Sequence, residues 1–145
     1  MNIFILLLLS HLLGDIVLPW HRITVMKRSE SFWVQLSGHI THAFIHGFFA
    51  ATLLFIFIND HIWLKAAALV FCTHLIIDVI RSNIEVKLYG AGTIKIKRME
   101  FIAWITGRNR DSIKMSSKNL TIWLSINILD QLFHIISLYI ISIVV

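Results

Sequence analysis

The stretch Leu36–Ile58, with the sequence LSGHITHAFIHGFFAATLLFIFI, decides the fold of this chain. An α-helix rises about 1.5 Å per residue, so about 20 mostly apolar residues cross the hydrocarbon core of a bilayer. The stretch is long enough for this, and its only ionisable side chains are three histidines. It therefore predicts a transmembrane helix that carries polar groups.

Three further stretches have the same character: Asn2–Trp20, Ile62–Ile80 and Leu120–Val145. Of the 145 residues, 57% are hydrophobic and 14% are charged, which is about half the usual charged share of a soluble protein. This composition excludes a soluble globular domain and a disordered chain. The sequence predicts an all-α membrane protein, a four-transmembrane-helix bundle that forms a single transmembrane domain over residues 1–145.

Two polar connections, His21–Gln35 and Arg81–Asn119, carry all but one of the 13 lysines and arginines. With four spans, both connections lie on one side of the membrane, and the positive-inside rule makes that side cytoplasmic. We therefore expect a multi-pass membrane protein with both termini outside the cytoplasm. The basic side chains would contact anionic membrane lipids, and nucleic-acid binding is disfavoured.

The long connection has a pattern of its own. Residues 85–97 alternate apolar and polar side chains around Gly90-Ala91-Gly92, which predicts a β-hairpin. The aromatic and apolar stretch Met99–Thr106 predicts a short helix in the membrane interface.

Each span carries polar residues three or four positions apart, and such residues share one face of a helix. An aspartate near the middle of a span costs at least about 2.5 kcal/mol on insertion, so we expect these polar stripes to have a functional or structural role. Counted from the cytoplasmic ends, they lie in the cytoplasmic half or near the midplane, where they could converge. The stripes are His11 and Asp15; His39, His42 and His46; His74 and Asp78; and Asn127, Asp130, Gln131 and His134.

Histidine nitrogen and aspartate oxygen are ligands for zinc, manganese and iron. Two histidines at i and i+4, as in His42 and His46, can bind one metal from one helix. A structural hydrogen-bond network between helices is the alternative. The sequence predicts a divalent metal site, with zinc or manganese favoured. Its predicted ligands are His11, Asp15, His39, His42, His46, His74 and Asp78.

Three motifs occur in order along the chain, with Lys27, His42 and His46 between the first and the second: HLLGD at 11–15, HLIID at 74–78 and DQLFH at 130–134. Together they resemble the bacterial integral-membrane family called domain of unknown function 3307. The resemblance covers the spans, implies a location in the bacterial cytoplasmic (inner) membrane and implies no activity. The layout of histidines and aspartates is also similar to that of membrane-bound metal-dependent hydrolases, which implies hydrolysis by analogy only.

A bound metal lowers the pKa of its water to about 7 and supplies hydroxide. The predicted catalytic residues are Asp130, as ligand or general base, with Gln131 and His134 orienting it or the substrate. The substrate would be an amphiphilic phosphate or ester. Other hypotheses remain open: a proton or metal ion translocator, which would require a homo-oligomer; a haem-binding bundle; and a membrane anchor that recruits a cytosolic protein through residues 81–119.

Overall fold

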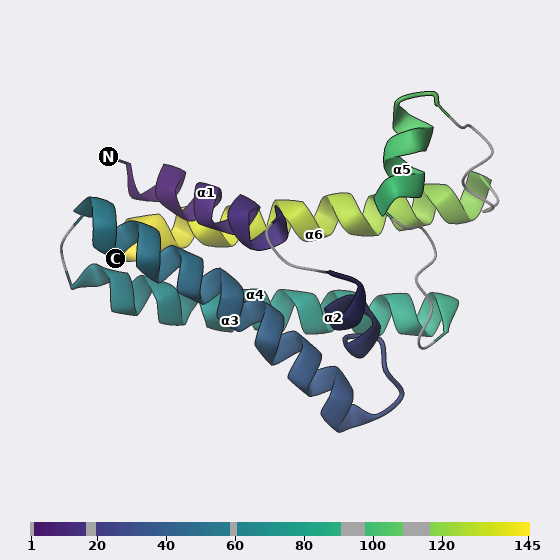
Figure 1. The fold of residues 1–145 in the computed structure, drawn as a ribbon, viewed down its shortest axis with the longest axis horizontal. Coiled ribbons are helices and arrows are strands. Elements are labelled where there is room, and N and C mark those ends of the chain that lie inside the picture. The colour runs from purple at the N-terminus through teal and green to yellow at the C-terminus, as the bar shows by residue number, and fades with distance from the viewer. Residues whose placement is uncertain (1, 17–19, 59–60, 91–97, 109–116) are drawn as a thin grey trace.

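The computed structural model describes residues 2–16, 20–58, 61–90, 98–108 and 117–145 (Figure 1). Within these ranges the chain is helical and contains no strand. The helices are α1 (Ile3–Ile16), α2 (Trp20–Met26), α3 (Phe32–Ile58), α4 (Ile62–Tyr89), α5 (Arg98–Ile105) and α6 (Ser117–Val144). The all-α prediction is confirmed for this part of the chain.

Three helices, α3, α4 and α6, are apolar and long enough to cross a membrane by length and composition. The first predicted span is shorter than expected. Helix α1 has 14 residues, which corresponds to about 21 Å, less than the hydrocarbon thickness of about 30 Å. It ends at Ile16, and the chain's single proline, Pro19, follows. A proline disfavours helical backbone at the residue before it.

The helices form an elongated bundle in which α3 packs on α4, α1 packs on α3 and α6, and α4 packs on α6 (Figure 1). The two termini lie at one end of the bundle, together with the end of α3 and the start of α4. We call this part the terminal half. The part that holds α2, the start of α3, the end of α4 and the start of α6 is the connection half.

The interior of the terminal half is apolar. Its buried core contains side chains from α1, α3, α4 and α6: Leu6, Leu7, Ala50, Leu54, Ala66, Val70, Leu138 and Ile141. Small residues let the helices approach closely there. A Cβ added to Gly47 would lie 3.1 Å from the backbone oxygen of Ala67. Such contacts are typical of helix pairs in membranes.

Helix α4 is longer than the predicted third span, which ended at Ile80. It continues to Tyr89, and Gly90, with φ of +89°, ends it. The predicted β-hairpin is therefore wrong for Glu85–Tyr89, while residues 91–97 lie outside the described residues. The charged Arg81 and Glu85 do not end the helix because both find partners inside the bundle, and their i, i+4 spacing favours helix.

The connection predicted over His21–Gln35 is partly helical, since it contains α2 and the first turn of α3. The end of α2 packs tightly on α3 at Gly38, where an added Cβ would lie 2.8 Å from Met26 Cβ and 2.9 Å from Lys27 N. This close approach brings Lys27 and Arg28 to the bundle interior. The predicted short helix over Met99–Thr106 is present as α5.

Candidate metal centre

The polar stripes of α1, α3, α4 and α6 meet in the connection half. Of the ten predicted site residues, the structure buries all except Asp15, which is partly exposed, and Gln131, which is exposed. The buried residues are His11, His39, His42, His46, His74, Asp78, Asp130 and His134.

Five imidazole rings form a continuous group. The ring of His74 stacks on His46 at a centroid distance of 3.8 Å and on His134 at 4.2 Å. His42 lies 4.7 Å from His46, and His11 lies 4.9 Å from His46. The rings come from four different helices, so the cluster depends on the packing of the whole bundle.

Room for the His46 ring comes from Gly14 in the HLLGD motif. A Cβ added to Gly14 would lie 2.6 Å from two atoms of that ring, closer than real contacts allow. The glycine therefore lets α1 approach α3 while the imidazole lies between them.

Four groups of three side chains place their ligand atoms within 4.8 Å of one another. Asp78 is one of four residues that belong to two groups, and the group of Asp78, Asp130 and His134 has no residue in common with two of the others. The groups are His11, His46 and His74; Asp15, His42 and His46; His42, His74 and Asp78; and Asp78, Asp130 and His134. These residues could hold one ion or two.

The spacing of the ligand atoms suits a shared cation better than direct hydrogen bonds. The Oδ2 atom of Asp78 lies 3.6 Å from His42 Nε2 and 3.7 Å from His74 Nε2. The Oδ1 atom of Asp15 lies 3.5 Å from His46 Nε2. Hydrogen bonds from nitrogen to oxygen span about 2.7–3.2 Å, whereas two ligands of one tetrahedral zinc lie about 3.4 Å apart. The side chains thus stand at roughly the separation that a metal ion between them would require.

Several atoms that point into the cluster lack a hydrogen bond. Within the described part of the chain, His46 Nε2, His74 Nε2 and Asp130 Oδ1 are buried without a hydrogen-bond partner. A buried polar atom in this state costs about 1–3 kcal/mol. An ion bound among these atoms would remove that cost, so the donor set fits a divalent metal such as zinc or manganese.

Two predicted residues stand apart from the four groups. His39 Nε2 lies 2.8 Å from the hydroxyl oxygen of Ser82, and His39 belongs to none of the groups found among the described residues. Gln131 bridges two members of the site, because its Oε1 lies 3.4 Å from His11 Nε2 and its Nε2 donates to Asp130 Oδ2 at 3.3 Å.

Three basic residues enter the bundle, although the sequence pattern placed them in the cytoplasmic connections. Lys27 Nζ lies 2.5 Å from Asp78 Oδ2. Arg28 pairs with Glu85, and its Nε donates to Oε2 at 2.8 Å. Arg81 donates through Nη1 to Asp130 Oδ2 at 3.0 Å and through Nη2 to Asn127 Oδ1 at 2.6 Å. For Arg81 the sequence held a clue, because positions 81, 82 and 85 continue the helical face of His74 and Asp78.

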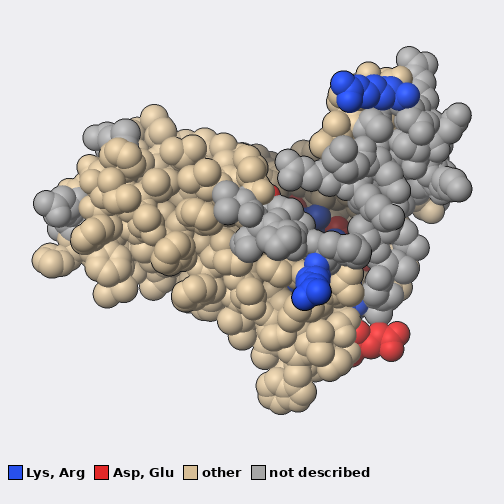
Figure 2. Space-filling view, in the orientation of Figure 1, with Lys and Arg blue, Asp and Glu red and all other residues tan. Residues whose placement is uncertain are grey.

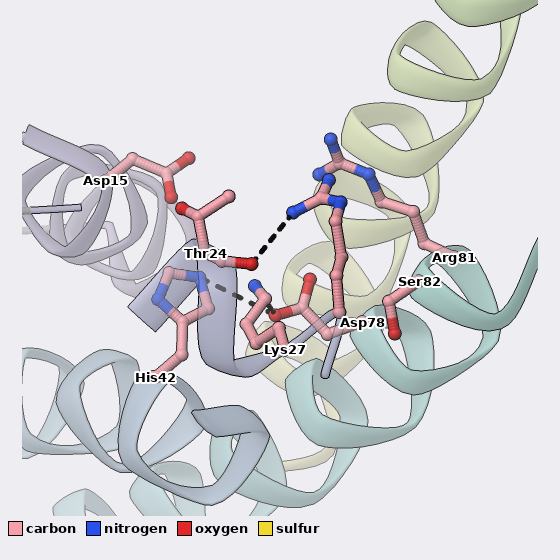
Figure 3. Close-up of a pocket in the computed structure, with 8 residues that line it drawn as sticks. Asp15, Thr24, Lys27, His42, Asp78, Arg81 and Ser82 are labelled. Carbon is pink, nitrogen blue, oxygen red and sulfur yellow. Dashed lines mark hydrogen bonds and ion pairs between the residues drawn. The ribbon is translucent and has the colours of Figure 1, made fainter. Parts of the chain in front are cut away.

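A pocket of about 130 Å³ joins the cluster to these basic residues (Figure 3). Charged side chains from α1, from α4 and from the residues that follow α2 converge on it, and Lys27 and Asp78 face each other there. Figure 2 shows charged atoms in a hollow of the connection half, whereas the described residues of the terminal half show no charged atoms on that face. The pocket is lined by Asp15, Thr24, Lys27, Arg28, His42, Asp78, Arg81 and Ser82.

The comparisons with known proteins give a family and no activity. The model of a family described as "Protein of unknown function (DUF3307)" matches residues 3–145. No curated protein and no solved structure matches the chain. Any function must therefore be argued from the site.

Proposed function

Because this chain belongs to the DUF3307 family, whose description names no activity, we propose a function from the site itself. We propose that it is a membrane metalloenzyme that binds a divalent ion, zinc or manganese, in the His/Asp cluster and hydrolyses an amphiphilic phosphate or ester. The observation that carries this proposal is the pocket that joins the cluster to Lys27, Arg28 and Arg81.

A divalent metal in such a site polarises the scissile group and supplies hydroxide near neutral pH. The chain's own residues prepare the rest. Arg81 and Gln131 hold Asp130 by Oδ2, which leaves Oδ1 facing His134 Nε2 at 3.6 Å. These contacts fix the carboxylate and leave Oδ1 without a hydrogen bond, so Oδ1 of Asp130 is the proposed proton acceptor and Asp130 the proposed general base, with Gln131 and His134 orienting it.

The apolar core favours an enzyme over a translocator. A proton or ion that crossed the bundle would have to pass the terminal half, where Leu7, Leu54 and Leu138 are buried and no described ionisable side chain is. Proton relays and ion pathways in membranes use chains of ionisable residues. The cluster instead ends where this core begins, as expected for a site that opens to one side.

The proposed location is the bacterial cytoplasmic membrane, with the connection half on the cytoplasmic side. The basic residues of the two connections support this orientation, and both termini lie at the opposite end (Figure 1). Reporter fusions at Val145 and at Lys114 should report opposite sides. A cytoplasmic signal at Val145 would refute the orientation.

Elemental analysis of the full chain, purified in detergent, tests the metal directly. We expect at least one divalent ion per chain, lost on treatment with a chelator. Metal-loaded and chelated samples are then compared on lipids that carry phosphomonoester, phosphodiester or carboxylic ester bonds, and only loaded protein should release product. A chain without stoichiometric metal refutes the proposal, and metal without hydrolysis of any such lipid refutes the enzymatic part.

A further inference from the structure

The charges around the pocket are nearly balanced without a metal. Three cations, Lys27, Arg28 and Arg81, face the carboxylates of Asp15, Asp78, Glu85 and Asp130. With neutral histidines, one negative charge is left over. A single divalent ion would turn this balance positive, and uncompensated charge in a buried site is costly. A metal-loaded site would therefore favour an anion in the pocket.

The contact of Lys27 shows which cation would be free to bind that anion. Its ammonium lies 2.5 Å from Asp78 Oδ2, the oxygen that also stands 3.6 Å from His42 Nε2 and 3.7 Å from His74 Nε2. Lys27 thus contacts the same oxygen that a metal bound by Asp78 and these histidines would use. Two cations at one oxygen repel each other strongly in a site of low dielectric, so metal binding would displace the ammonium.

The space next to Lys27 is the pocket itself. Arg28 and Arg81 line it, with Arg81 visible in Figure 3, and guanidinium recognises phosphate oxygens with paired donors. At about 130 Å³, the pocket has room for a head group and too little for an acyl chain. A neutral ester would leave the positive balance uncompensated, whereas the negative charge of a phosphate group would offset it.

We propose that this pocket binds a phosphate group of the substrate, and that metal binding at Asp78 releases Lys27 to hold that phosphate. This inference rests on the proposed function and specifies its substrate class. The phosphate could belong to a lipid head group or to a water-soluble molecule. Since binding free energies are reciprocally coupled, phosphate should tighten the metal as the metal tightens phosphate, by about tenfold.

The test measures Mn²⁺ affinity by calorimetry on the full chain in dodecylmaltoside micelles, which contain no phosphate. One sample receives no addition, a second inorganic phosphate and a third a short-chain phosphatidic acid, with protein-free micelles as blanks. Tighter Mn²⁺ binding by about tenfold in either of the last two samples supports the phosphate site. The sample that responds identifies the source, and unchanged affinity in both overturns the inference.

Variants of Lys27 test the release step. Lys27→Met should bind Mn²⁺ at least about tenfold more tightly than the wild type, because the competing cation is gone, and phosphate should no longer change that affinity. Lys27→Arg keeps the charge and should bind Mn²⁺ about as weakly as the wild type. The matched control is Lys87→Met, an exposed lysine on α4, which should leave both affinities unchanged.

Lys27→Met binding Mn²⁺ no more tightly than the wild type overturns the release step. If Lys27→Met does not fold, the inference is tested by the effect of phosphate on Mn²⁺ affinity in the wild type and in Lys27→Arg. The absence of that effect refutes the inference. A wild type that binds Mn²⁺ without any phosphate effect refutes only the inference. A wild type that binds no metal at all refutes the proposed function as well.

Discussion

The terminal half and the connection half of the bundle share α3, α4 and α6, yet the interior of the first is apolar and the interior of the second is polar. On α4, the buried face runs through Ala66 and Val70 in the terminal half and continues through His74, Asp78 and Glu85 in the connection half. On α3, which runs the other way, His39, His42 and His46 precede Ala50 and Leu54. The change from polar to apolar occurs at a similar level on both helices, so one bundle combines an apolar core with a polar site.

The two halves of the bundle have different roles, packing in the terminal half and a polar site in the connection half. The terminal half holds the helices together by close packing, since lipid tails are as apolar as leucine and only good packing favours protein contacts over lipid contacts. The connection half contributes buried polar atoms that lack partners, which destabilise an empty bundle. Substitutions in the connection half should therefore alter metal binding and hydrolysis, and substitutions in the terminal half should alter only the stability of the fold.

The largest expected effect comes from removing a central ligand in the connection half. His74→Ala should weaken metal binding by at least about 100-fold and leave the purified protein without stoichiometric metal, while far-ultraviolet circular dichroism still shows a helical protein. Elemental analysis provides the measurement. His61→Ala, at an exposed position beside the start of α4, is the control and should keep its metal. Full metal content in His74→Ala would show that His74 is not a ligand of the metal.

The next effect concerns turnover with the metal in place. Asp130→Asn should lower the rate of hydrolysis by about 10²–10⁴-fold, the usual contribution of a general base, because the amide cannot accept the proton. Metal content should stay at one equivalent or more if Asp130 is not a ligand. Both quantities are measured on one preparation. Loss of metal together with activity would make Asp130 a ligand instead.

Two glycines allow a matched test of the two halves. Gly14→Ala forces a methyl group against the His46 ring, so metal affinity should fall by about tenfold or more, as when groups that orient ligands are disturbed. Gly47→Ala adds the same methyl group on α3, where it meets the backbone of Ala67. It should reduce thermal stability and leave metal affinity unchanged. Equal effects on metal affinity would contradict the division of roles.

The smallest expected effect on the site comes from the apolar core. Leu54 is fully buried in the terminal half, and Leu54→Ala should lower the free energy of unfolding by about 2 kcal/mol, mainly through lost packing. The metal content per folded chain should not change. Thermal unfolding in detergent measures the first quantity and elemental analysis the second. Metal loss at unchanged helicity would show that the two halves are coupled.

Much of the fold follows from hydrophobic pattern. Long apolar stretches predicted α3, α4 and α6, because a bilayer requires about 20 such residues whatever the tertiary contacts are. The short length of α1 and the position at which α4 ends could not be predicted from this pattern. Residues 85–89 alternate like a strand, yet they stay helical because Glu85 pairs with Arg28 and Arg81 inside the bundle. That pairing joins residues far apart in the chain, and no local pattern contains it.

The site divides in the same way. Helical spacing predicted the stripes that contain His11, His42, His74, Asp78 and His134, because residues three or four apart always share a face. The sequence pattern placed the basic residues of the pocket in the polar connections, because a lysine or arginine beyond a span normally lies in water. In the structure, α2 folds back on α3 at Gly38 and carries Lys27 to Asp78.

By itself, the sequence determined that the chain is apolar, helical and striped with histidine and aspartate, because composition and helical periodicity are local properties. Only the tertiary structure decided which stripes touch, which ring atoms are left without partners and which cations neutralise the carboxylates. These features depend on how closely α1, α2, α3, α4 and α6 approach one another. That approach is set by contacts between distant residues, such as Gly14 with His46 and Arg81 with Asp130, which no single segment encodes.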